Sequence, residues 1–137
     1  MSVNSILRKS GINKTELTKL LNYLGIEDAL INWKSNFSTE PDYMILNIGG
    51  PQRNGRLMGG THFVAVDNKN KRYFDSLSFP PVEGIPEDYE YVRLQVQDES
   101  YGHCGAYCAL FLLYSKFNEI DKFYDMFHID HKYSSIS

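Results

Sequence analysis

Residues 99–117, ESYGHCGAYCALFLLYSKF, constrain the fold of this chain more than any other stretch. A polar turn that contains glycine runs directly into an apolar segment, which predicts a buried helix beginning at Cys104. Cys108 lies one turn further along, among apolar residues, and we interpret it as a small, inert core residue. A thiol at the exposed start of the helix needs another explanation, because core packing does not require a cysteine there.

The rest of the chain supplies elements that can cover this helix. Leucines at a helical spacing predict a helix over residues 13–25, beginning with a capping box and ending at a glycine. Asn118 can cap a last helix over residues 119–127. Runs of apolar residues between turns predict four strands, at residues 43–48, 61–67, 72–75 and 89–96. This order predicts a single α+β domain over residues 1–137, with a mainly antiparallel sheet packed against the Cys104 helix.

Composition excludes several classes of protein. The chain has 137 residues, of which 42% are hydrophobic and 14% aromatic, as in a packed globular domain. A net charge of −3 provides no basic footprint for nucleic acid or anionic membranes. The first residues lack the apolar core of a signal peptide, and no apolar run is long enough to span a bilayer. Two cysteines do not make a disulfide framework, so we expect reduced thiols in a reducing intracellular compartment.

Cys104 has the position expected of a nucleophile. The N–H groups and dipole at the start of a helix favour negative charge, and therefore the reactive thiolate. A nucleophilic cysteine needs a base, and the base needs an orienting acid. If the strand beginning at His62 forms a hairpin in which Asp67 faces Arg72, then His62 and Asp75 are diagonal neighbours on one face of the sheet. Asp75 can then hold one imidazole nitrogen and leave the other for the thiol, whereas Asp67 points to the opposite face.

The other histidines fit the role of base less well. His103 is adjacent to Cys104, so the two side chains leave the backbone in different directions. His128 and His131 lie in the polar C-terminal segment, where we expect surface positions.

An oxyanion hole needs donors besides the backbone N–H of Cys104, and a glutamine amide can supply one. Gln97 and Gln95 precede Cys104 by seven and nine residues. The residues alone do not decide between these two glutamines.

The order His62, Asp75, Gln97, Cys104, within the segments GGTHFVAV, YFDS and QDESYGHCGAYCALFL, resembles the adenovirus proteinase (adenain) family of cysteine peptidases. That family has a glycine pair before the histidine strand and a Cys-Gly-x-x-Cys start to its central helix. Its glutamine precedes the cysteine by the spacing of Gln97, which favours Gln97 over Gln95. The resemblance covers most of the chain and implies the adenain/SUMO-protease fold, with these four residues catalytic and with no cofactor or metal.

The resemblance also implies a biological role. It indicates a viral maturation endopeptidase that cleaves capsid or core precursor proteins after glycine-containing sites, in the infected host cell and in the virion interior. The chain departs from the family at Phe63, where tryptophan is usual, and at Asp75, where adenoviral enzymes have glutamate, and it is shorter and less basic. We therefore expect a virophage or related DNA virus, a monomer, and no requirement for DNA, while an activating peptide stays open.

Three alternatives remain at this stage. SUMO- and ubiquitin-like-protein proteases share the residue order and the preference for glycine pairs, although they are usually longer. A metal-binding module would use His62, His103, Cys104 and Cys108, but adjacent ligands fit the usual zinc spacing poorly. An inactive relative would act as a scaffold.

Overall fold

The computed structural model describes residues 12–49, 52–53, 56–57, 62–76, 79–92 and 104–126. These residues form three α-helices, which are α2 (Lys14–Tyr23), α3 (Cys104–Lys116) and α4 (Ile120–Met126), and one 3₁₀ turn, η1 (Lys34–Asn36). The strands are β1 (Leu30–Trp33), β2 (Tyr43–Gly49), β3 (Gln52–Arg53), β4 (Arg56–Leu57), β5 (His62–Asp67), β6 (Arg72–Phe74) and β7 (Glu90–Val92). Within these ranges no helix is long and apolar enough to cross a membrane.

The main sheet has five strands in the order β1-β2-β5-β6-β7, which confirms the α+β class. Its central pairs are antiparallel, but β1 runs parallel to β2 and β7 runs parallel to β6. The sheet is therefore mixed, and the expectation of a mainly antiparallel sheet was wrong at both edges. The physical reason is that each edge strand is joined to its neighbour by a connection long enough to return the chain to the same end of the sheet.

The helix ends follow local side-chain chemistry. The Asn13 side chain accepts a hydrogen bond from the Glu16 N–H at 2.8 Å, and the Glu16 carboxylate accepts one from the Asn13 N–H at 3.1 Å, so the predicted capping box is confirmed. Gly25 ends this helix with φ +79°. Asn118 has φ +55° and donates its N–H to the Ser115 carbonyl, so it closes α3. The expectation that Asn118 caps α4 was therefore wrong.

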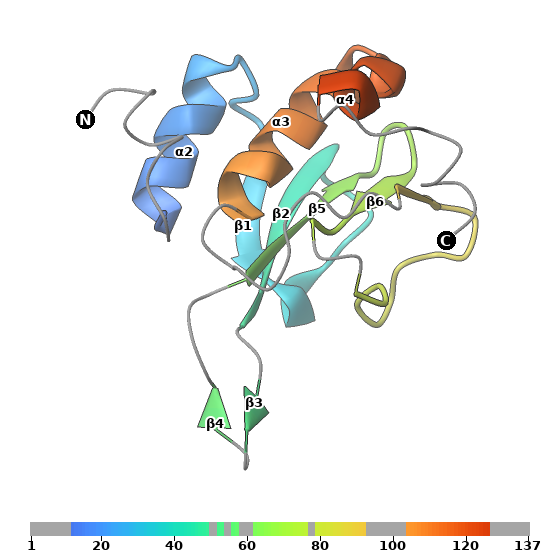
Figure 1. The fold of residues 1–137 in the computed structure, drawn as a ribbon. Helices are drawn as coiled ribbons and strands as arrows, with labels where there is room; N and C mark the ends of the chain where they lie inside the picture. Colours follow the sequence, from blue (N-terminus) through green and yellow to red (C-terminus); the bar gives the residue numbers. More distant parts are fainter. Residues whose placement is uncertain are drawn as a thin grey trace.

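All three helices lie on one face of the sheet, and the β3–β4 hairpin projects away from them (Figure 1). Every residue of β5 is buried, because loop residues cover the opposite face of the sheet. On the helix face, the Phe111 ring of α3 stacks on the Phe74 ring of β6, with centroids 5.1 Å apart. This packing fixes α3 over the sheet and brings its first residue to the end of the sheet at which β5 begins.

Candidate active site

The histidine and aspartate predicted from the sequence lie together. Asp67 pairs with Arg72 across the β5–β6 hairpin, which confirms the predicted register. The Nε2 atom of His62 lies 2.7 Å from Oδ1 of Asp75, and both side chains are almost completely buried. Asp67 turns to the helix face instead, where it accepts a hydrogen bond from Ser115 of α3. The alternation of side chains along β5 therefore separates the two aspartates as expected.

Cys104 is the first residue of α3, as predicted. Its side chain is not exposed, however, since the residue is only 2% accessible, and the expectation of an exposed thiol was wrong. One cause is the close approach of β5, because the Phe63 N–H donates a hydrogen bond to the Cys104 Sγ at 3.4 Å. The sulfur is therefore covered by neighbouring residues rather than open to solvent.

The charge on His62 depends on both neighbours. Burial alone would lower the pKa of the imidazole, but hydrogen bonds to Asp75 and Cys104 and the attraction of their negative charges outweigh burial and raise the pKa from 6.5 to about 9. Because Asp75 holds Nε2, the other ring nitrogen is the one suited to the thiol. Near neutral pH the raised pKa therefore favours the imidazolium form of His62, which lies between the Asp75 and Cys104 side chains.

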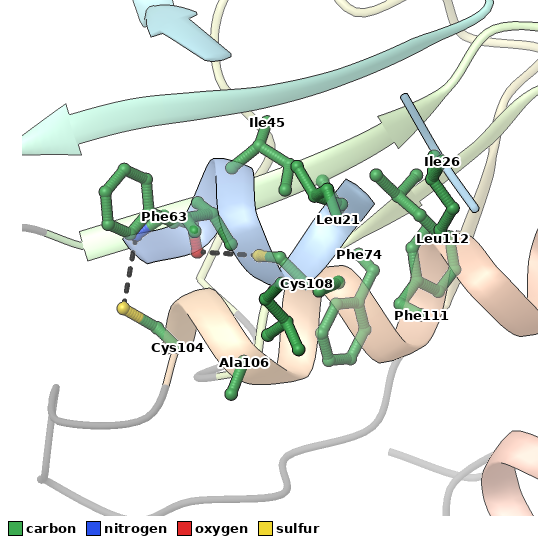
Figure 2. Close-up of a cluster of buried hydrophobic side chains, with 14 of the residues drawn as sticks. Leu21, Ile26, Ile45, Phe63, Phe74, Cys104, Ala106, Cys108, Phe111 and Leu112 are labelled. Atoms are coloured by element: carbon green, nitrogen blue, oxygen red, sulfur yellow. Dashed lines mark hydrogen bonds between the residues drawn. The ribbon is translucent and has the colours of Figure 1, made fainter. Parts of the chain in front are cut away.

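The two cysteines contact the same residue in different ways. Figure 2 shows Cys104 and Cys108 on either side of the Phe63 backbone, with Cys104 accepting from its N–H and Cys108 donating to its carbonyl at 3.3 Å. Complete burial raises the pKa of Cys108 well above its usual value, so this residue remains a thiol. Cys108 fits the predicted inert core role, and its S–H also ties α3 to β5 next to the candidate site.

A cleft of about 300 Å³ borders Phe63 and is walled by the residues before α2 and by the ends of β1 and β2. Ile12 lines this cleft and also touches α3, since a Cβ at Gly105 would come within 2.9 Å of its Cδ1. Glycine directly after Cys104 thus lets the cleft wall approach the start of the helix closely. Trp33, which is 57% exposed, lies on the other side of the cleft and gives it an apolar rim.

A larger cleft of about 860 Å³ lies between η1 and residues 80–84. Neither Cys104, His62 nor Asp75 lines it, so cleft volume does not by itself locate the chemistry. The arrangement of the three reactive side chains is the stronger guide.

Several residues of the sequence interpretation lie outside the described ranges: Gln95, Gln97, His103, His128 and His131. The structure therefore does not test the choice of glutamine. Among the residues that are described, no group of three or more His, Cys, Asp or Glu side chains could hold a metal ion. The sequence interpretation did not include the Phe63 N–H as a donor to the Cys104 sulfur, although Phe63 directly follows His62 in the sequence.

No protein-family model, curated protein or solved structure matches this chain significantly. Conclusions about function therefore rest on the geometry of the site and on the motifs of the sequence.

Proposed function

We propose that this protein is a cysteine endopeptidase of the adenain-like type, in which Cys104 is the nucleophile, His62 the proton carrier and Asp75 the orienting acid. The observation that carries the proposal is the meeting of these three side chains from α3, β5 and the end of β6. They are separated by 13 and 29 residues in sequence yet share one buried hydrogen-bonded cluster. The mixed sheet with α3 on one face is compatible with the adenain/SUMO-protease fold, which is part of the same proposal.

In the proposed reaction the Cys104 thiolate attacks the carbonyl carbon of the scissile peptide bond. The carbonyl oxygen becomes an oxyanion, which the backbone N–H of Cys104 and the amide of Gln97 stabilise. As the C–N bond breaks, the His62 imidazolium donates its proton to the leaving amine, and a thioester remains on Cys104. Neutral His62 then takes a proton from water, whose oxygen attacks the thioester and releases the acid and the free enzyme.

Asp75 holds the imidazole in the orientation that this proton transfer needs. Its carboxylate lies 2.7 Å from Nε2 and favours the imidazolium, the form required when the leaving amine departs. The Phe63 N–H is an additional donor to the Cys104 sulfur and favours its negative charge. The tight packing around Cys104 is consistent with substrates that have glycine next to the cleaved bond, because a narrow approach excludes larger side chains.

The motif resemblance suggests the substrates and setting. We propose that the enzyme cleaves capsid or core precursor proteins of a DNA virus during virion maturation, in the infected cell and inside the virion. It would act as a monomer, without a cofactor and without DNA. The cleft beside Phe63 is the described surface best placed to hold a peptide leading to Cys104.

The experiment is cleavage of peptides containing Leu-x-Gly-Gly by the wild type, by Cys104→Ala and by Cys108→Ala as the matched cysteine control. We expect turnover by the wild type and by Cys108→Ala, none by Cys104→Ala, and a steep fall in kcat/KM when the last glycine becomes Phe. A ubiquitin-like fusion protein serves as a second substrate. Selective cleavage of the fusion would indicate the SUMO-protease alternative, and turnover by Cys104→Ala would refute the proposed nucleophile.

A further inference from the structure

An aromatic ring outside the reactive cluster lies against His62. The Phe79 ring, from the loop between β6 and β7, meets the imidazole edge to face, with centroids 5.9 Å apart and planes at 67°. Phe79 is 42% exposed, whereas His62 is 1% exposed. The phenyl ring therefore stands between the buried imidazole and the solvent.

Two tyrosine hydroxyls fasten this loop to the sheet. The Tyr91 hydroxyl of β7 donates to the Phe79 carbonyl, and the Val82 N–H donates to the Tyr73 hydroxyl of β6 at 3.3 Å. The rings of Tyr73 and Tyr91 pack edge to face with centroids 5.2 Å apart. The position of Phe79 is thus set by contacts with the sheet itself, because both tyrosines belong to strands of the sheet that carries His62.

We infer that Phe79 is a positioning residue, which holds the His62 imidazole against Asp75 and keeps water from the hydrogen bond between them. Exclusion of water lowers the local dielectric and strengthens the attraction between imidazolium and carboxylate.

The kinetic consequence rests on the proposed peptidase function. Phe79→Ala should lower kcat for the Leu-x-Gly-Gly peptide by about tenfold with little change in KM, because proton transfer depends on the orientation of His62. Phe79→Leu should recover part of the loss, and Phe79→Tyr most of it. The matched control is Phe117→Ala, which removes a ring that is 63% exposed just beyond the other end of α3. The control should retain wild-type kcat, and both alanine variants should have similar melting temperatures.

A second readout is independent of peptidase activity. The proton on Nε2 of His62, which faces Asp75, should give a resolved NMR signal in the wild type because it exchanges slowly with water. This signal should be lost in Phe79→Ala and kept in Phe79→Leu and Phe117→Ala. The signal is assigned by its absence in His62→Ala.

The two readouts separate the two proposals. If the wild type cleaves no peptide, the proposed function fails, while loss of the Nε2 signal in Phe79→Ala still supports the role of Phe79. Retention of the signal in Phe79→Ala, its equal loss in Phe117→Ala, or its absence from the wild type would each overturn the inference.

Discussion

Replacing Asp75 by asparagine should lower the pKa of His62 by more than about one pH unit. The pKa of the imidazole is raised from 6.5 to about 9, although burial, the largest single influence, lowers it. The hydrogen bond to Asp75 outweighs the hydrogen bond to Cys104, and the charge of Asp75 outweighs the charge of Cys104. Asp75 therefore supplies the larger share of the rise, and its loss leaves burial opposed by Cys104 alone.

The energetic scale follows from the same values. The rise from 6.5 to about 9 corresponds to about 3 kcal/mol in favour of the imidazolium. Losing the larger share of it should leave His62 mostly neutral near pH 8. We expect kcat to fall as well, though by less than in His62→Ala, because asparagine can still orient the ring.

The assay is an NMR titration of the imidazole ¹³Cε1 resonances, with His62 assigned by its loss in His62→Ala. Asp67→Asn is the matched control, since Asp67 is equally buried in β5 but bonds to Asn70 and Ser115 instead of His62. An unchanged pKa in Asp75→Asn, or an equal fall in Asp67→Asn, would refute the argument that direct contact with Asp75 raises the pKa.

Three further predictions follow from the site. Gln97→Ala should lower kcat about 100- to 1,000-fold in the peptide assay with little change in KM, whereas Gln95→Ala should be nearly neutral, and a reversed result would move the oxyanion hole to Gln95. Cys108→Ala should reduce the free energy of unfolding by about 1–2 kcal/mol in urea titrations and leave kcat close to wild type, so a large kcat loss without destabilisation would contradict its packing role. The stability that the raised pKa of His62 provides is complete below about pH 6.5 and is lost as pH rises through about 9, so the difference in unfolding free energy between wild type and Asp75→Asn should narrow over that range.

The parts of the site that the sequence predicted depend on local geometry. His62 and Asp75 could be brought together because side chains alternate along a strand and a short turn fixes which residues face each other. The start of α3 at Cys104 could be predicted because a polar turn changes abruptly into an apolar run. Both signals are contained within a few residues, so no knowledge of distant contacts was needed.

The parts that were missed depend on contacts between distant segments. β1 escaped prediction because three of its four residues are exposed and its parallel partner is reached only through a long connection. One cause of the burial of Cys104 is the approach of Phe63, which is 41 residues away in sequence. Phe79 lies in a loop without periodic pattern, and its contact with His62 follows from the attachment of that loop to Tyr91 and Tyr73.

The most direct test of the proposed mechanism is intact-protein and peptide mass spectrometry of the enzyme quenched in acid during turnover of a Leu-x-Gly-Gly substrate. A thioester intermediate requires that the acyl half of the substrate be bound to the sulfur of Cys104. We predict an adduct of that mass on the peptide containing Cys104, located at Cys104, and no adduct in Cys104→Ala. Cleavage without any adduct on the enzyme, or an adduct at Cys108, would contradict nucleophilic catalysis by Cys104.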